Sequence, residues 1–183
     1  MVKLGDICDI YIGGTPSRKI GKYWGGKNLW VKIKDMKKNA SSIMDTEEKI
    51  TDEGINKSSV KLLKKGTLLF SFKLTIGKVV IAGRDLYTNE AIAGIVPKDG
   101  KVLMKYLYYI LPRLDYLSYC QRATKGMTLN KEILNSLSIP LPSVAEQEKI
   151  IKKLDEIELR KYKYLENLKN ATAEQDREIL NIL

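Results

Sequence analysis

The segment from Gly13 to Gly26, GGTPSRKIGKYWGG, places cationic, hydroxyl and aromatic side chains among glycines. Hydroxyls and cations suit phosphate contacts, arginine suits guanine edges, and exposed rings can pack against sugars or unstacked bases. The segment is therefore a candidate nucleic-acid contact. The other interpretation is a structural turn with both tryptophans in the core, which we expect of Trp30 and leave open for Trp24. The candidate contacts are Thr15, Ser17, Arg18, Lys22, Tyr23 and Trp24.

Further candidates lie in the polar segment Arg122 to Asn130 and on isolated lysines. Asparagine can read adenine in the major groove, so Asn130 is a candidate base contact, with Lys125 and Thr128 beside it. Thr128 has the alternative role of capping the next helix. We expect Lys34 and Lys73 to contact phosphates, whereas the runs Lys37-Lys38 and Lys64-Lys65 are typical of solvated surface.

Residue types that most catalytic sites require are missing. The chain has no histidine, which excludes Ser-His-Asp and Cys-His sites and histidine-bound metals. Cys8 and Cys120 lack metal-ligand spacing, so we expect reduced thiols and no metal or cofactor. Asp45, Glu47 and Lys49 resemble the carboxylate and lysine set of metal-dependent nucleases, but this Asp is too near the Glu for separate strands to bring them together. A small nuclease is the least favoured alternative.

Positive charge is concentrated in the first part of the chain. The 183 residues carry a net charge of +10, and residues 1–143 hold 24 Lys and Arg against 13 Asp and Glu, a net +11. Residues 144–183 hold 8 against 9, a net −1. This pattern predicts a polyanion-binding domain followed by a nearly neutral tail, although a merely soluble surface is the competing interpretation. No apolar run approaches a membrane span, so we expect a cytoplasmic protein with no membrane partner.

The order of predicted elements is β-rich first and helical last. A helical stripe from Leu103 to Leu117 should be kinked or split by Pro112. Thr51 should cap a short helical turn that ends at Gly54, and Lys3 to Tyr11 is compatible with a short helix or a strand. Apolar, β-branched runs predict strands over 29–33, 68–72, 79–82 and 91–96.

The last part predicts one long helix. After Ile139-Pro140-Leu141-Pro142 forces an extended exit, Ser143 and Glu146 form a capping box, and no Pro or Gly follows. Along this helix, residues at alternating spacings of four and three form the a/d seam of a coiled coil, which continues through Lys161, Ala171 and Gln175. A seam of this kind must pair with another helix. The fold class predicted is α+β, with a mixed β-rich domain over 1–142 and a helix over 143–183 forming an antiparallel coiled coil. Its expected interface residues are Ile150, Leu154, Ile157, Tyr164 and Leu168.

Four ordered blocks resemble the specificity subunits of Type I restriction-modification systems. They are GGTPS with YWGG and LWVKIKD, the stretch from Ile50 to Ala82, TNEAIAGIVP, and GMTLNKEILNSLSIPLPSVAEQEKII. The resemblance implies a target-recognition domain, followed by a spacer helix, that reads double-stranded DNA and has no active site. It also implies modification subunits that bind S-adenosylmethionine and methylate adenine, and a restriction subunit joined through the complex. Consistently, the sequence has no Gly-rich cofactor loop and no Asn/Asp-Pro-Pro-Tyr/Phe tetrapeptide.

The sequence departs from the family pattern in two respects. Asn89-Glu90 stands where the family commonly has Asn-Gln, which adds a charge. One recognition domain and one helix are present where a standard subunit has two of each, so the chain resembles a half-subunit, natural or cut from a longer parent. We therefore expect a homodimer through the helix. A coiled-coil adaptor without DNA binding is the alternative.

Overall fold

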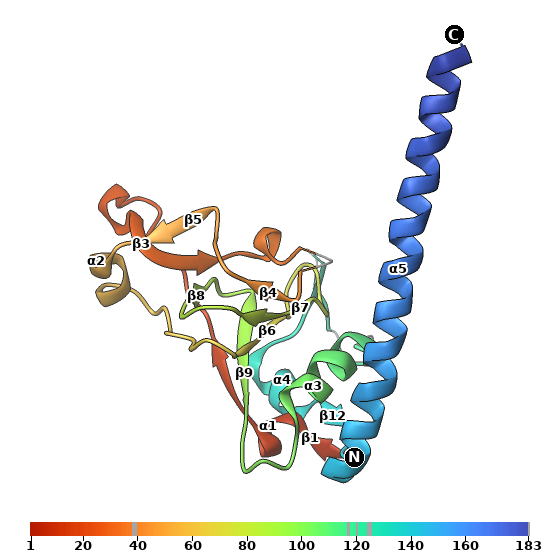
Figure 1. Ribbon diagram of the computed structural model, residues 1–183. Helices are drawn as coiled ribbons and strands as arrows, with labels where there is room; N and C mark the ends of the chain where they lie inside the picture. Colours follow the sequence, from red (N-terminus) through yellow and green to blue (C-terminus); the bar gives the residue numbers. More distant parts are fainter. Residues whose placement is uncertain (38–39, 117, 120, 124–125, 183) are drawn as a thin grey trace.

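The computed structural model describes residues 1–182 except 38–39, 117, 120 and 124–125. Figure 1 shows a β-rich domain with one long helix, α5, that runs along its side and projects beyond it. Mixed sheets are followed by the helix Val144–Ile182, so the predicted α+β class is confirmed. The division between domain and helix at residues 142 and 143 stays a prediction.

A five-stranded sheet forms the centre of the domain. Strand β6 lies in its middle and is buried along its whole length, because both faces of the sheet are covered. Leu68 and Phe70 face one core cluster, whereas Leu69 faces a second one. The first cluster is shared with α1 (Leu4–Ile7), α3 (Met104–Ile110) and α4 (Lys131–Ser136), and the second with β3 (Trp24–Val31). The pleat alternates the side chains between the two faces. The strand order is β2 (Cys8–Ile12), β9 (Ile92–Pro97), β6 (Leu68–Ser71), β7 (Val79–Ala82) and β4 (Ser42–Ile43), with only β4 and β7 parallel.

A three-stranded sheet extends from one side of the domain. Strand β3 (Trp24–Val31) pairs antiparallel with β5 (Glu48–Ile50) and parallel with β8 (Tyr87–Thr88). Its pairing with β5 is interrupted by a bulge between Trp24 and Asn28, where Gly25 has a φ of 78° that favours glycine. Because of this bulge, Trp24 and Asn28 are both paired with Ile50 of β5.

Short elements complete the domain. Strand β1 (Val2–Lys3) pairs with β12 (Ser138–Ile139), which brings the beginning of the chain to the exit before α5. Strand β10 (Gln121–Ala123) pairs with β11 (Gly126–Thr128). The helices are α1 (Leu4–Ile7), η1 (Gly21–Tyr23), η2 (Ile33–Asp35), α2 (Asp52–Asn56), α3 (Met104–Ile110), η3 (Leu111–Arg113) and α4 (Lys131–Ser136).

Local sequence signals predicted several element boundaries, with two corrections. Thr51 caps α2 as predicted, since Gly54 N donates to its Oγ1 at 3.0 Å. The prediction that Gly54 ends this helix was wrong, because α2 continues to Asn56. The stripe from Leu103 is also shorter than predicted: α3 ends at Ile110, and η3, with Pro112 in its first turn, ends at Arg113.

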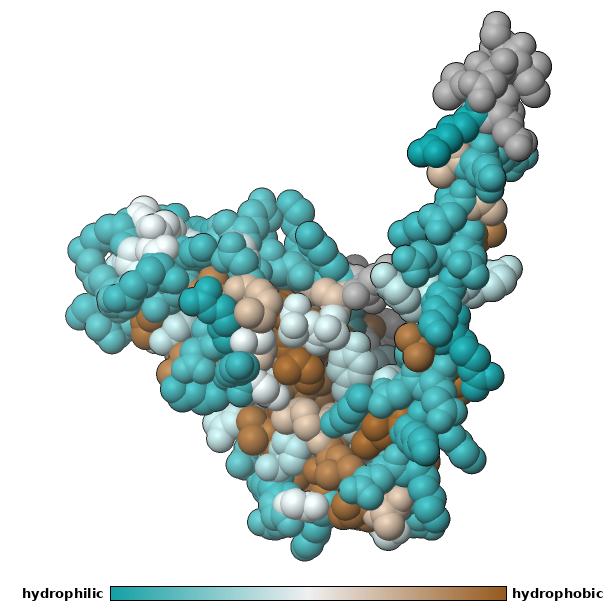
Figure 2. Space-filling model, in the orientation of Figure 1, coloured by the Kyte–Doolittle hydropathy of each residue, from teal (hydrophilic) through white to brown (hydrophobic). Residues whose placement is uncertain are grey.

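Helix α5 begins at a reciprocal cap. Glu146 N donates to Ser143 Oγ at 3.3 Å, and Ser143 N donates to the Glu146 carboxylate at 2.9 Å, so the predicted capping box is confirmed. The 39 residues of the helix are about 58 Å long at 1.5 Å per residue. Only its first turns pack against the domain, and the projecting part is largely hydrophilic in Figure 2.

A polar clamp fixes α5 to α3. Gln147 is fully buried; its Oε1 accepts from Leu103 N at 2.9 Å, and its Nε2 donates to the carbonyls of Lys101 at 2.9 Å and Pro142 at 3.0 Å. Two turns later Asp155 accepts from Lys105 Nζ at 2.6 Å and from the Tyr109 hydroxyl. These bonds satisfy every polar atom of the Gln147 side chain, so they set the angle at which the helix leaves the domain.

Candidate nucleic-acid interface

The loop after β2 is anchored by two indoles. Trp30 Nε1 donates to Gly14 O at 2.9 Å, and Trp24 Nε1 donates to Ser17 O at 3.2 Å. The two rings pack edge to face, 5.0 Å apart. Trp30 is only 2% exposed and belongs to the core as expected, while Trp24 is half-buried. Each indole holds a backbone carbonyl of the loop, so the loop has a defined shape without secondary structure of its own.

Arg18 lies over this aromatic support. Its guanidinium carbon is 3.7 Å from the centroid of the Trp24 ring and 5.0 Å from that of Trp30. A guanidinium over an indole face is held by the ring quadrupole, which restricts the rotamers of a side chain that is otherwise flexible. Half of the Arg18 side chain remains exposed. The arrangement suits a cation that is positioned before a ligand arrives.

Glu48 pairs with the terminal nitrogens of Arg18. Both terminal nitrogens of Arg18 donate to the Glu48 carboxylate, and Lys32 Nζ donates to Glu48 Oε2 at 2.8 Å. The hydrogen bonds from Arg18 and then Lys32 lower the pKa of Glu48 to about 2. Sequence reasoning missed this role, because no local pattern links positions 18 and 48. Both terminal nitrogens of Arg18 are thus paired with a carboxylate, while half of the side chain remains exposed.

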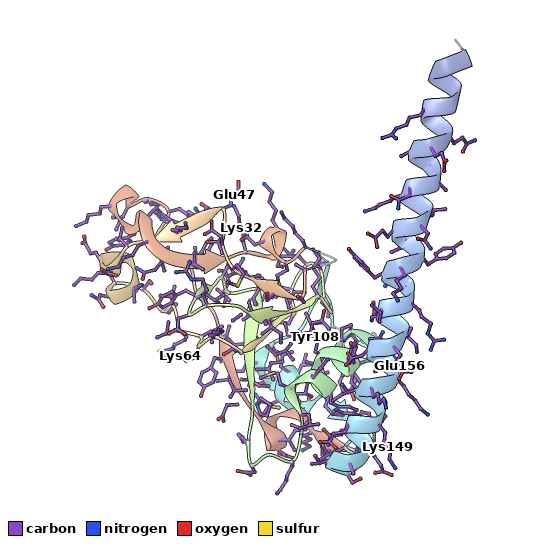
Figure 3. The ribbon with its side chains drawn as sticks, viewed as in Figure 1. Lys32, Glu47, Lys64, Tyr108, Lys149 and Glu156 are labelled. Carbon is purple, nitrogen blue, oxygen red and sulfur yellow. The ribbon has the colours of Figure 1, made fainter. Side chains whose placement is uncertain are left out.

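Lysines compensate the carboxylates beside this cluster. Glu47 Oε2 is 3.2 Å from both Lys32 Nζ and Lys34 Nζ, and Figure 3 labels Lys32 and Glu47 beside each other. Asp45 is 3.0 Å from Lys49. Within the described residues, no group of three or more His, Cys, Asp or Glu side chains is arranged to hold a metal ion.

Thr15 and Glu90 join two further segments to the loop. The hydroxyl of Thr15 donates to the Glu90 carboxylate. Burial raises the pKa of Glu90, but this hydrogen bond and the charges of Lys73 and Arg18 outweigh it, so the pKa is lowered. Gly13 allows the approach, since a Cβ there would lie 2.2 Å from Asn89 O. The structure thus brings together segments at positions 13–18, 73 and 89–90.

Other predicted contacts are placed differently. Tyr23 is only 9% exposed, so its ring packs in the domain and presents little surface to a ligand. Lys22 is largely exposed and pairs with Glu53 at 2.6 Å. Ser17 is exposed beside Arg18. Asn130 caps α4, its Oδ1 accepting from Ile133 N at 2.8 Å.

The cap at Asn130 bears on two predictions. It gives the capping role to Asn130 rather than Thr128, and it engages the amide oxygen that adenine readout requires. Thr128 lies in β11, but its side chain is outside the described residues, as is Lys125 altogether.

The predicted seam of α5 divides into two parts. Ile150 packs against the domain core and Leu154 is partly buried, so the domain covers the beginning of the seam. Ile157, Tyr164 and Leu168 are each more than half exposed. The described helices include none that is long and apolar enough to cross a membrane.

The net charge of +11 over residues 1–143 makes this β-rich domain a candidate for binding nucleic acid. The chain belongs to the Type I restriction modification DNA specificity domain family, whose model matches residues 1–174. This match confirms the resemblance to Type I specificity subunits, and it includes the domain and most of α5.

Individual relatives agree with this assignment. The chain is 37% identical over 152 residues to the Type I restriction enzyme MjaIX specificity subunit of Methanocaldococcus jannaschii, covering 81% of this chain and 35% of that protein. It is 27% identical over 163 residues to the EcoR124I/EcoR124II specificity subunit of Escherichia coli, covering 85% and 40%. The chain therefore spans well under half the length of these relatives.

Solved structures show the same fold. A chain from a structure of a type I R-M system, described for its complex assembly and conformational transition, superposes with a TM-score of 0.71 at 23% identity, covering 99% of this chain and 42% of that one. The HsdS subunit from Thermoanaerobacter tengcongensis gives a TM-score of 0.65 at 23% identity, covering 87% and 37%.

Proposed function

We propose that this chain reads one part of a DNA target for a Type I restriction-modification enzyme and performs no chemistry itself. The observation that carries the proposal is the family match over residues 1–174. In this proposal the chain binds double-stranded DNA, positions modification subunits that methylate adenine, and joins the restriction subunit through the complex. It needs no cofactor of its own.

The proposed DNA surface centres on the loop from Thr15 to Arg18 and on Lys73. Arg18 is the proposed guanine contact, because arginine can donate two bonds to O6 and N7 and half of this side chain is exposed. In this proposal guanine takes over donors of Arg18 that Glu48 holds in the free protein. Lys22 and Lys34 are largely exposed and are proposed to contact phosphates. Trp24 is proposed to support Arg18, and Thr15 to hold the loop through Glu90.

The exposed part of the α5 seam supports a pairing proposal. Ile157, Tyr164 and Leu168 repeat at coiled-coil spacing on α5, and each is more than half exposed. An antiparallel pair with a second copy would cover these side chains and place two domains at opposite ends of a rod about 58 Å long. Two-fold symmetry then predicts a gapped palindrome, with half-sites at most roughly 17 base pairs apart at about 3.4 Å per pair.

Sedimentation and DNA binding together test the proposal. The unchanged chain should be a dimer at tens of micromolar and should bind duplex DNA with strong salt dependence. Tyr164→Lys should give monomers that retain weak nonspecific binding. Asn170→Lys adds the same charge on another face of the helix, so this control should remain dimeric. A wild-type monomer would contradict self-pairing.

Two assays separate the competing functions. A coiled-coil adaptor would dimerise but would show no salt-dependent affinity for duplex DNA. Methyl transfer from labelled S-adenosylmethionine by the purified chain alone, or magnesium-dependent cleavage, would contradict the absence of catalysis. Methylation should require the cognate modification subunits.

A further inference from the structure

The turn between β6 and β7 holds a leucine in an unfavourable backbone conformation. Leu74 has a φ of 63°, and Thr75 N donates to Lys73 O at 2.7 Å across it, which defines a γ-turn. Positive φ is uncommon for residues other than glycine and costs conformational energy for a large side chain. A leucine at such a position therefore needs an explanation.

Ser71 maintains this turn. Its hydroxyl donates to Thr75 O and accepts from Lys78 N at 3.0 Å, while its carbonyl accepts from Gly77 N at 3.0 Å. Ser71 is itself fully buried at the end of the central strand β6. Because several bonds fix the turn from the sheet, the strained residue is held rigidly.

Packing does not account for Leu74. Its side chain is 75% exposed, and of the large hydrophobic residues with described exposure only Met1 is more exposed. A single exposed leucine is ordinary on a protein surface. An exposed leucine with a positive φ is unusual, because glycine would adopt the same backbone conformation without strain and without placing an apolar group in water.

The turn leaves the sheet beside the proposed DNA surface. Phe72 N donates to Ala91 O at 3.0 Å, next to Glu90, which holds Thr15. The charge of Lys73, which immediately precedes Leu74, acts on the same Glu90 carboxylate. The exposed aliphatic side chain of Leu74 is therefore flanked in the chain by Lys73 and Thr75, whose cation and hydroxyl suit phosphates and polar base edges.

We propose that Leu74 contacts the 5-methyl group of a thymine in the major groove and so determines specificity at one base pair of the target. The inference rests on the proposed DNA-reading function. Among the groups that base edges present in the major groove, the thymine methyl is the apolar one, so it matches an exposed aliphatic side chain. The tip of a rigid turn can enter the major groove of DNA, which is about 12 Å wide, and Lys73, the preceding residue, can then contact a phosphate.

Selection from random duplexes by the full chain provides the test. The wild type should select a defined sequence in which replacing one thymidine by deoxyuridine weakens binding about fourfold, the effect of burying one methyl group. Leu74→Ala should lose affinity for the thymidine duplex and show no further loss with deoxyuridine. Leu74→Gly should bind like Leu74→Ala while unfolding at the same or a higher temperature, because glycine relieves the strain.

A matched control and the opposing results complete the experiment. Leu62, also exposed, lies on the segment that enters β6 from its other end, so Leu62→Ala should keep the wild-type preference. If Leu74→Ala retains the preference for thymidine and the sensitivity to deoxyuridine, the proposal is wrong. If the wild type selects no sequence, the proposed function fails as well, so the two failures are distinguishable.

Discussion

Replacing Gln147 by alanine should loosen α5 from the domain. The side chain makes three hydrogen bonds, to Leu103 N and to the carbonyls of Lys101 and Pro142, and it is fully buried. Alanine removes all three hydrogen bonds, so the Leu103 amide and the carbonyls of Lys101 and Pro142 lose their side-chain partner. A residue in the first turn of α5 thereby holds the helix against the domain.

The expected loss follows from the three bonds. At about 1 kcal/mol each, they predict that the free energy of unfolding falls by about 3 kcal/mol. For a chain of this size, about 2–4 °C per kcal/mol corresponds to a midpoint lowered by roughly 6–12 °C. Unpaired buried backbone groups would increase the loss, whereas water entering the space would reduce it.

Urea unfolding followed by circular dichroism measures this difference. Glu148→Ala is the matched control, because Glu148 is exposed on the adjacent position of the same helix and should change the free energy by less than 0.5 kcal/mol in either direction, about the usual limit for surface sites. Limited proteolysis near residues 140–146 should cut Gln147→Ala faster than the wild type. A loss below about 1 kcal/mol would refute the clamp as the fixing element.

Three further changes test other parts of the structure. Lys73→Ala should weaken binding to all duplexes and reduce the slope of log affinity against log salt by about 1, measured by fluorescence anisotropy at several salt concentrations; an unchanged slope would place the phosphate contact elsewhere. Glu48→Gln should be less stable than the wild type above pH 4.5, where Glu48 is ionised in both the folded and the unfolded protein. Because pairing with Arg18 lowers the pKa of Glu48 in the folded protein to about 2, the difference in the free energy of unfolding should disappear as the pH falls from 4.5 to 2. A difference that does not change with pH would contradict this reasoning. Thr51→Ala removes the cap of α2 and should lower the free energy of unfolding by about 1 kcal/mol in urea, whereas Thr51→Ser should restore most of it.

Local signals in the sequence were sufficient for the features that depend on neighbouring residues. The cap at Ser143 and Glu146 and the cap at Thr51 involve side chains three positions from the amides they bind, so their spacing predicted them. The four apolar runs predicted β3, β6, β7 and β9, with ends shifted by tertiary pairing: β3 begins at Trp24, five residues earlier than predicted, through its bulged pairing with β5.

Only the tertiary structure decided how the candidate site is assembled. Arg18 meets Glu48 and Thr15 meets Glu90 across 30 and 75 positions, and nothing in the sequence near either residue specifies its partner. The burial of Tyr23 and the backbone conformation of Leu74 were equally inaccessible, because both depend on what packs around the chain or ties its turn. Helix and strand periodicity and helix caps depend on residues a few positions apart. The contacts of Arg18, Thr15 and Tyr23 form only when the sheets assemble and bring together loops that are distant in the sequence.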